Sequence, residues 1–330
     1  MILLQVIIHL PDISDSELQV HAVGQPLGLL PVAGNVVLGH TLHQVLTKAG
    51  FVDAEVVVLT PTHASEIAAW LAAAYPTANA KVILQPDATG PLSALWMFRD
   101  RLASENVLLL LGQYIAEAPY EELVASDADA ACLVQEHATV VVAERVSVTE
   151  ATLSSDAQNG TLPLAGACWF RRGADLVPAL EELTGKGSES VAALLEQLQR
   201  RGWQMVALAA YACVRTDSQA ALQDANARLL GLGYGSEDAI ERSYAEDFTV
   251  LPPVFIHEDA VVENAVLGPF VNVEAGAIVR NSIVRNTIVG AGCQVEDVVL
   301  DSSLLGQDVR VKGRALTISA GAATRVEWGG

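Results

Sequence analysis

Residues 261–300 read VVENAVLGPFVNVEAGAIVRNSIVRNTIVGAGCQVEDVVL, and across the wider region 256–313 an aliphatic residue returns every five or six positions. The recurring residues are Ile256, Val262, Leu267, Val273, Val279, Val284, Val289, Val295, Leu300, Leu305 and Val311. Small or turn-prone residues such as Gly276, Asn281 and Gly292 separate them. An α-helix repeats every ~3.6 residues and a half-buried strand every ~2, so neither has this spacing. Short parallel strands that are joined at corners and stacked coil upon coil have this spacing. The region therefore predicts a β-solenoid.

The overall composition is that of a folded chain with an acidic surface. Its 330 residues allow two domains, each with a core of its own. The 39 acidic and 19 basic residues give a net charge of −20. Because an acidic surface repels phosphate backbones, no nucleic-acid partner is expected. No stretch approaches the ~20 apolar residues of a membrane-spanning helix, so we expect no membrane association.

The cysteines and the first residues bear on the cellular compartment. Cys132, Cys168, Cys213 and Cys293 are scattered, without C-x-x-C spacing. This argues against a metal cluster or a disulfide framework and predicts reduced thiols in a cytoplasmic protein. Met1–Leu10 is apolar but short and lacks a basic start, so it predicts a buried strand instead of a signal peptide.

Residues 1–230 alternate between strand-like and helix-like patterns. Strands are expected at residues 3–10, 55–60, 81–85, 107–111, 130–135, 139–147 and 203–211, and helices at residues 39–49, 63–74, 91–102, 174–184, 188–201 and 217–230. This alternation predicts an α/β domain on a parallel sheet, with ligands bound beyond the carboxyl ends of the strands. We place the boundary near residues 235–250, giving an α/β domain at 1–240, the solenoid at 250–318 and a tail at 319–330.

Four segments of the first domain resemble motifs of one family, in the same order along the chain. Leu29–Leu38 (LLPVAGNVVL), which follows Pro26, is similar to P-K-P-x-L-P-V-x-G-K-P-L. The others are Val82–Gly90 (VILQPDATG), Leu108–Gln113 (LLLLGQ) and Thr216–Asn226 (TDSQAALQDAN). With the solenoid, they resemble the sugar-phosphate nucleotidyltransferases, in particular the glucose-1-phosphate thymidylyltransferase-like branch. The resemblance implies a Rossmann-like nucleotidyltransferase (glycosyltransferase-A-like) domain followed by a left-handed parallel β-helix of hexapeptide repeats.

The chemistry that the resemblance implies needs groups that this chain lacks. Nucleotidyl transfer depends on positioning and charge neutralisation, by a Gly-rich phosphate loop, basic side chains and carboxylates that hold Mg²⁺. In place of the family's G-G-x-G-T-R-L, residues 9–17 read HLPDISDSE. The family's Lys falls on Leu27, and its two metal-binding Asp positions fall on Gln113 and Arg215. Its sugar-contacting Glu-Lys-Pro has no counterpart between residues 135 and 166.

These losses predict a protein without catalytic residues and without a metal or other cofactor. Removing one preorganised group from an active site costs ~10²–10³ in rate, and here several are missing together. We expect a regulatory or scaffolding subunit of nucleotide-sugar metabolism that binds itself or an active paralogue through the β-helix. One alternative is an active nucleotidyltransferase with a diverged phosphate loop, which would use Asp12 or Asp15 to hold Mg²⁺. Another is a nucleotide-sugar sensor that binds without reacting.

Five positions remain candidates for a vestigial ligand site. Gln85 and Gly90 match positions that contact the nucleotide base in the family that the chain resembles, and Gly112 and Gln113 match its Gly-Asp. Arg215 beside Gln113 would place a fixed cation where the metal lies, able to hold a phosphate-bearing ligand. The alternative is a salt bridge from Arg215 to a nearby carboxylate, or a plain hydrogen-bonded strand end in the case of Gln85.

Three histidines are further candidate positions. His40 and His43 are three apart on an expected helix and could share a metal, but without a third ligand a solvated polar face is the simpler interpretation. His257 opens the solenoid, where hexapeptide acyltransferases place a general base, yet the expected β-helix is short and lacks their inserts.

Overall fold

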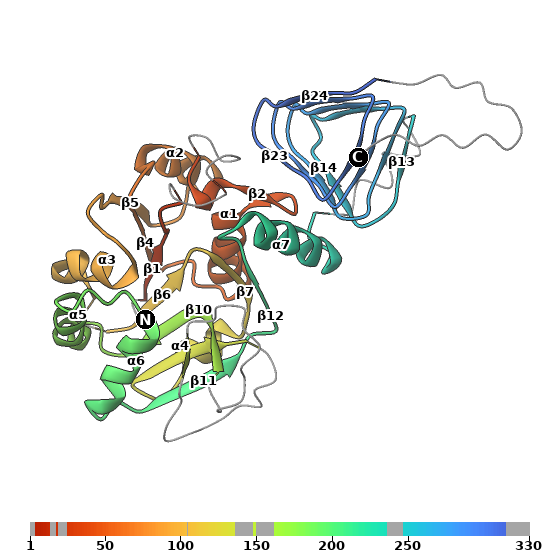
Figure 1. Ribbon diagram of the computed structural model, residues 1–330. Helices are drawn as coiled ribbons and strands as arrows, with labels where there is room; N and C mark the ends of the chain where they lie inside the picture. The colour runs from red at the N-terminus through yellow and green to blue at the C-terminus, as the bar shows by residue number, and fades with distance from the viewer. Residues whose placement is uncertain are drawn as a thin grey trace, which may run out of the picture. The chain divides into compact units, whose positions relative to one another are not determined.

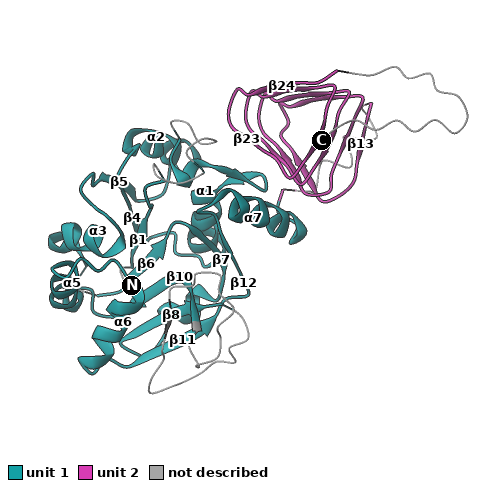
Figure 2. Ribbon diagram, viewed as in Figure 1, with its two compact units in different colours: residues 1–234 teal, residues 235–330 magenta. Residues whose placement is uncertain are grey.

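The computed structural model describes residues 4–13, 18, 25–103, 105–135, 148–149, 162–235 and 247–314. The chain divides into two compact units, residues 1–234 and residues 235–330 (Figure 2). Within the described ranges, no helix combines the length and the apolar character needed to span a membrane.

A mixed eight-stranded sheet is the centre of the first unit (Figure 1). Its order is β11-β8-β10-β6-β1-β4-β5, with β9 paired to β10. The strands are β1 (Gln5–His9), β4 (Glu55–Thr60), β5 (Ala80–Leu84), β6 (Val107–Leu111), β8 (Ala130–Val134), β9 (Val148–Thr149), β10 (Leu162–Phe170) and β11 (Met205–Ala209). Two smaller sheets pair β2 (Pro31–Val32) with β3 (Asn35–Val36) and β7 (Tyr114–Glu117) with β12 (Ala212–Arg215). β6 is five buried aliphatic residues in a row, as a strand covered on both faces requires.

Helices cover both faces of this sheet (Figure 1). One apolar cluster joins it to α3 (Pro91–Phe98), α5 (Val177–Thr184) and α6 (Val191–Arg200). A second cluster joins the opposite face to α1 (Val37–Leu42), α2 (Ala64–Ala74) and α4 (Tyr120–Val124). Local signals set these helices. Ser190 caps α6 by accepting from Ala193 N at 3.1 Å, and buried leucines follow at helical spacing.

The remaining helical elements are short or lie beyond these layers. They are the 3₁₀ turns η2 (Leu27–Leu29), η4 (Arg99–Arg101) and η6 (Ala174–Leu176), the π-helical stretch η3 (His43–Lys48) and the helix α7 (Gln219–Gly231). The helix expected at residues 39–49 is thus α1 followed by η3, because the chain widens into a π-helix after Leu42.

The sequence predicted much of this unit, with specific differences. The strands expected at residues 55–60 and 107–111 are β4 and β6 with the same bounds. The sheet is mixed, since β10 runs antiparallel to both β6 and β8. β7 and β12 were not expected, because four residues are too few to show a period. The strand expected at residues 139–147 lies outside the described residues.

The second unit is a left-handed parallel β-helix, as predicted. Three four-stranded parallel sheets form its sides. They consist of β13 (Phe248–Val250), β16 (Ala265–Leu267), β19 (Ile283–Arg285) and β22 (Val299–Asp301); of β14 (Val254–Ile256), β17 (Val271–Val273), β20 (Ile288–Val289) and β23 (Leu304–Leu305); and of β15 (Val261–Glu263), β18 (Ile278–Arg280), β21 (Gln294–Glu296) and β24 (Arg310–Lys312). The expected aliphatic column fills the interior, where Val262, Val279 and Val295 stack on one another.

The coils are shorter than three full hexapeptides. Val262 pairs with Val279, and Val279 pairs with Val295, so successive coils advance by 17 and then 16 residues. Left-handed residues shorten the corners. At one corner Asn264, Asn281 and Asp297 have φ of 48°, 48° and 56°. Asn and Asp tolerate this conformation better than other residues with a side chain, which explains the turn-prone residues of the repeat.

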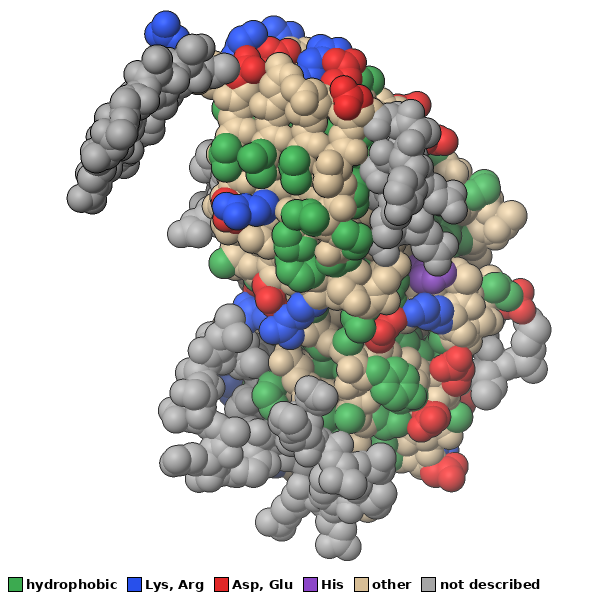
Figure 3. All heavy atoms as spheres, turned by 90° about the vertical axis from the view of Figure 1, so that its right-hand side faces the viewer, with side chains coloured by type: hydrophobic (Ala, Val, Ile, Leu, Met, Phe, Trp, Pro, Cys, Tyr) green, Lys and Arg blue, Asp and Glu red, His purple; other side chains and the backbone are tan. Residues whose placement is uncertain are grey.

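The outer surface of the β-helix carries charges and apolar side chains in rows. Glu263 binds Arg280 at 2.7 Å, and Glu296 binds Lys312 at 2.8 Å, so acidic and basic residues alternate across the coils (Figure 3). On another sheet, Ile283 pairs with Val299, which is 65% exposed.

Candidate functional site

The topology of the sheet places the candidate site. β1, β4, β5 and β6 are parallel and share a carboxyl edge. β4 and β5 lie on one side of β1, and β6 lies on the other. A doubly wound sheet binds its ligand at such a switch point. Here that point lies between His9, the last residue of β1, and Gly112, which follows β6.

Protein atoms close this switch point. Gly112 N donates to His9 O at 2.7 Å, so the two strands stay joined past their ends. A Cβ at position 112 would overlap Leu10 Cδ2 and lie 2.9 Å from His9 O. Leu10 is 1% exposed, and its Cδ1 lies 3.0 Å from where a Cβ of Gly28 would be. A phosphate cradle needs backbone N–H groups that point at the ligand, whereas this N–H is already bonded and Leu10 fills the space beside it.

His9 adds no positive charge to this edge. Its side chain is 4% exposed, and its Nδ1 has no hydrogen-bond partner within the described part of the chain. Burial lowers the pKa of His9 to about 4, an effect that the negative charge of Glu189 partly offsets. The imidazole is therefore neutral at pH 7 and cannot bind a phosphate by charge.

The other positions of the phosphate site are equally unsuited. Leu27, at the place of the family's Lys, is buried in η2 and belongs to the core. Asp12 is exposed, and Asp15 lies outside the described residues. None of these described side chains supplies the basic group for phosphates that the sequence lacks.

Gln113 and Arg215 do lie together, as the sequence predicted. Thr216 N and Oγ1 both bond to Gln113 O, at 3.0 and 3.2 Å, which ties the end of β12 to the turn between β6 and β7. Arg215 forms an ion pair with Asp217, and its Cζ lies 6.0 Å from the ring centroid of Tyr114. The hydrogen bond to Asp217 raises the pKa of Arg215 further. The structure therefore contains the salt bridge that the sequence left as an alternative.

Gln85 and Gly90 also come together, at the start of α3. Gln85 is 4% exposed, and its Nε2 donates to Ala94 O at 3.1 Å. Its Oε1 has no partner among the described residues. Gly90 N and Thr89 N both donate to Ser93 Oγ, at 3.1 and 2.9 Å. The two N–H groups that directly precede this helix are therefore bonded within the segment itself.

Glu189 occupies the rest of the helix start. Its Oε2 accepts from Leu92 N at 2.8 Å and from Ser93 N at 2.9 Å, and its Oε1 accepts from Thr89 Oγ1 at 2.9 Å. A Cβ at Gly90 would lie 2.8 Å from Glu189 Cβ, Cγ and Oε2, so only glycine leaves room for this side chain. The sequence did not point to Glu189, because a carboxylate that caps a helix from about a hundred residues away leaves no local pattern.

This constellation does not fit the magnesium ion that nucleotidyl transfer requires. Where the resemblance implies two carboxylates, the chain has the neutral amide of Gln113 and the paired guanidinium of Arg215. Mg²⁺ binds through oxygen ligands, above all carboxylates. Among the described residues, no three His, Cys, Asp or Glu side chains are grouped so as to hold a metal.

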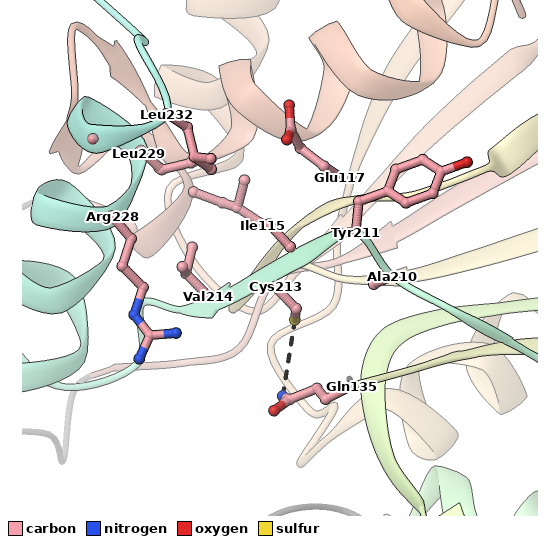
Figure 4. Close-up of a pocket in the computed structure, with 12 residues that line it drawn as sticks. Ile115, Glu117, Gln135, Ala210, Tyr211, Cys213, Val214, Arg228, Leu229 and Leu232 are labelled. Atoms are coloured by element: carbon pink, nitrogen blue, oxygen red, sulfur yellow. Dashed lines mark hydrogen bonds between the residues drawn. The ribbon is translucent and has the colours of Figure 1, made fainter. Parts of the chain in front are cut away.

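A separate cavity of about 350 Å³ lies between the β7–β12 sheet and the end of α7 (Figure 4). Ile115, Val214 and Leu229 line it with apolar groups, and Gln135 Nε2 lies 3.9 Å from Cys213 Sγ. Burial raises the pKa of the Cys213 thiol to about 12, so the sulfur stays protonated and is a poor nucleophile.

The structure gives each of the three histidines considered from the sequence a different setting. His43 is half-buried at the start of η3. His40 is buried and bonds through Nε2 to Val32 O at 2.8 Å, so the prediction of a solvated face is wrong for this residue. The cause is that every residue of α1 is buried. His257 Nδ1 accepts from Asp259 N at 3.1 Å.

Comparison with known proteins supports the fold. No family model matches the chain, and no curated protein matches it either. Solved structures do match, among them the 2.76 Å crystal structure of a Bacillus anthracis protein described as a glucose-1-phosphate thymidylyltransferase, in complex with a sucrose. The two are 18% identical, the match covers 68% of this chain and 94% of the other, and the TM-score is 0.54. At this identity the likeness shows a nucleotidyltransferase-like fold.

Proposed function

We propose that this chain is a non-catalytic, nucleotidyltransferase-like protein that acts as a regulatory or scaffolding subunit in nucleotide-sugar metabolism. One observation carries the proposal: the switch point of the sheet is closed by the Gly112 N to His9 O bond and by the Leu10 side chain. Phosphoryl chemistry depends on positioning and charge, and neither is available at a filled edge.

The two alternatives have less support. An active enzyme would need a basic group on the phosphates, whereas Leu27 is buried and Arg215 is paired with Asp217. A nucleotide-sugar sensor would need free donors near Gln85 and Gly90, whereas Ser93 and Glu189 already accept from the N–H groups there.

The β-helix is the part that we propose for contacts with a second copy or an active paralogue. Its side with Ile283 and Val299 offers exposed aliphatic groups beside the Arg285–Asp301 ion pair, and apolar groups bordered by polar ones are typical of a contact surface. Cys132, Cys168, Cys213 and Cys293 are all free thiols, which supports a reducing, cytoplasmic location for the protein.

An activity assay tests the proposal. Purified protein is incubated with Mg²⁺, each nucleoside triphosphate and a panel of sugar 1-phosphates, and pyrophosphate release is measured. We expect release no faster than in the blank without protein. Release that is saturable and absent from a Gln113→Ala/Arg215→Ala double variant would contradict the proposal. Native mass spectrometry of the same preparation reports whether the chain associates with itself.

A further inference from the structure

Two neighbouring hollows of the first unit have no part in the proposed function. One is the cavity of about 350 Å³ between the β7–β12 sheet and the end of α7 (Figure 4). The other, of about 500 Å³ and more open to solvent, lies between η3, the end of β7 and the start of α4. Glu117 and Tyr211 line both hollows, and Tyr211 N donates to Glu117 O at 2.8 Å. The hollows therefore adjoin at this pair of residues, and together they form what we call the Tyr211 groove.

The cavity end of the Tyr211 groove is apolar. Ile115, Val214 and Leu229 line it with buried side chains. Tyr211 and Leu232 also line it, and these two are 70% and 53% exposed. Large apolar side chains that stay exposed around a hollow are typical of a binding surface, and ~300 Å³ is enough for a small organic molecule. This end of the groove therefore suits an apolar or aromatic group.

The other end of the groove carries negative charge. Glu121 and Glu122, in the first turn of α4, line it with exposed carboxylates, and neither takes part in an ion pair within the described ranges. The exposed ring of Tyr211 lines both ends of the groove. Because the face of an aromatic ring attracts a cation, the ring and the carboxylates favour the same kind of group.

The basic side chains of the groove do not cancel this charge. Lys48 Nζ lies 2.6 Å from Glu117 Oε1, and Arg228 Nε lies 2.9 Å from Asp224 Oδ2. Each of the two cations is thus matched by a carboxylate of its own, which leaves the carboxylates of α4 as the excess charge. A ligand that carries a phosphate or a carboxylate would be repelled here, whereas a cation would be attracted.

We propose that the Tyr211 groove binds a small organic cation, in which an ammonium group is joined to an apolar or aromatic body. The body fills the cavity beside the β7–β12 sheet, and the ammonium lies over the ring of Tyr211 and beside the carboxylates of Glu121 and Glu122. Burial of the apolar body supplies affinity, and the charge of the groove selects the cation. This inference goes beyond the proposed function, because neither Gln113 nor Arg215 lines the groove.

Isothermal titration calorimetry with three probes of similar shape tests the proposal. They are phenethylamine, which is a cation at pH 7, the neutral phenethyl alcohol and the anion phenylacetate. We expect phenethylamine to bind about tenfold more tightly than the alcohol, since the carboxylates and the aromatic ring attract only the cation. Phenylacetate should not bind. The difference between amine and alcohol should shrink in 1 M NaCl, where the Debye length is ~3 Å.

Matched variants locate the origin of this difference. Glu121→Gln/Glu122→Gln keeps the shape of both side chains and should bring the affinity for phenethylamine close to that for the alcohol. Glu258→Gln/Asp259→Asn removes the same number of charges from an exposed position in the second unit, and it should leave the difference as in the wild type. Tyr211→Ala should weaken the binding of both probes, because the ring lines the cavity and the acidic end alike.

Three outcomes would overturn the proposal. The first is no measurable binding of phenethylamine to the wild type. The second is an affinity for the alcohol or for phenylacetate that equals the affinity for the amine. The third is a preference for the amine that persists unchanged in Glu121→Gln/Glu122→Gln. Each is read from binding and not from turnover, so the result is independent of the pyrophosphate assay that tests the proposed function.

Discussion

The β-helix and the carboxyl edge of the α/β sheet keep their folds by opposite means. In the β-helix each structural position recurs one coil later with a residue of the same kind, as Val262, Val279 and Val295 do. At the carboxyl edge nothing recurs, and single side chains from distant segments fill the space. Leu10 fills the gap beside Gly112, and Glu189 covers Gly90.

The difference teaches that a fold and the chemistry of its site are held by different kinds of contact. Repetition stabilises the β-helix through many equivalent contacts, so its structure can be read from the period of the sequence. At the carboxyl edge the strand order and the glycines set the path of the backbone, and the side chains around them bind one another. A nucleotidyltransferase-like fold therefore does not by itself specify the chemistry of this edge, which depends on the residues placed there.

The largest effect that we predict is a loss of stability in the β-helix that leaves the stability of the α/β unit unchanged. Val279→Asp places a carboxylate in the dry interior of the β-helix and should cost about 4 kcal/mol or more. Because the β-helix has an apolar cluster of its own, it should unfold separately from the first unit. The strand signal in far-UV circular dichroism should therefore begin to fall at a lower urea concentration than in the wild type. The fluorescence of Trp70, Trp96, Trp169 and Trp203, all in the first unit, should keep its midpoint. It is read in a Trp328→Phe background, because the fifth tryptophan belongs to the second unit.

The matched control is Val299→Asp, at a position that is 65% exposed. It should change neither signal. If Val279→Asp and Val299→Asp lowered the stability of the β-helix equally, the stacked valines at its centre would not form a water-free interior.

The next effect is a pH dependence to which the closed edge contributes through His9. The folded protein holds His9 neutral down to pH about 4, whereas the unfolded chain takes up a proton near pH 6.5. The unfolded state thus binds more protons between these values, and stability falls as the pH is lowered from about 6.5 to 4, by about 3 kcal/mol from this residue. Urea midpoints should show this slope, and His9→Asn should make it shallower. Burial also lowers the pKa of His40, so that residue adds to the slope that remains.

His63→Asn provides the comparison, since His63 is partly exposed and lies 3.5 Å from Glu66. This variant should keep the slope of the wild type. A slope as steep in His9→Asn as in the wild type would show that the imidazole of His9 does not contribute to it.

A smaller effect measures the contact between Leu10 and Gly112. Gly112→Ala should cost about 1–3 kcal/mol, because the new methyl group overlaps Leu10. In a Leu10→Ala background the same change should cost about 1 kcal/mol less, which a double-mutant cycle of urea midpoints would detect. Gly231→Ala, where a Cβ meets no atoms within 4 Å, is the control and should be close to neutral. If the stability costs of Gly112→Ala and Leu10→Ala simply add, Leu10 does not contact the position that the new methyl group occupies.

The smallest effect concerns the charged row on the β-helix. Arg280→Ala removes the ion pair with Glu263, at 2.7 Å on an exposed face. The loss of stability should be small and should vanish in 1 M salt, where the Debye length is ~3 Å. Arg310, for which no ion pair is found among the described residues, is the control: Arg310→Ala should not change the salt dependence. A loss that persists at high salt would point to packing by the Arg280 side chain.

The sequence predicted the β-helix in detail because its period comes from local packing. The turn-prone residues were visible as well, and Asn281 and Gly292 lie at corners with positive φ. The 16- and 17-residue coils follow from the five- and six-residue spacings, although the hexapeptide description overstated their length.

The sequence showed what the candidate site lacks but not what fills it. Gln113 and Arg215 lie together, as the resemblance implied, because Gln113 precedes the start of β7 and Arg215 ends β12, which pairs with β7. The pairing of Arg215 with Asp217 remained open, because a short range of sequence holds several carboxylates. Leu10 and Glu189 act through contacts with segments far along the chain, and no local pattern encodes such contacts.

The most direct test of the closed edge is a crystal grown with a nucleoside triphosphate and Mn²⁺, examined by anomalous scattering at the manganese edge. We predict no manganese peak beside Gln113 and Arg215 and no triphosphate between His9 and Gly112. Two ordered ions at those positions, bridged by phosphate, would contradict the claim that this edge of the sheet is closed.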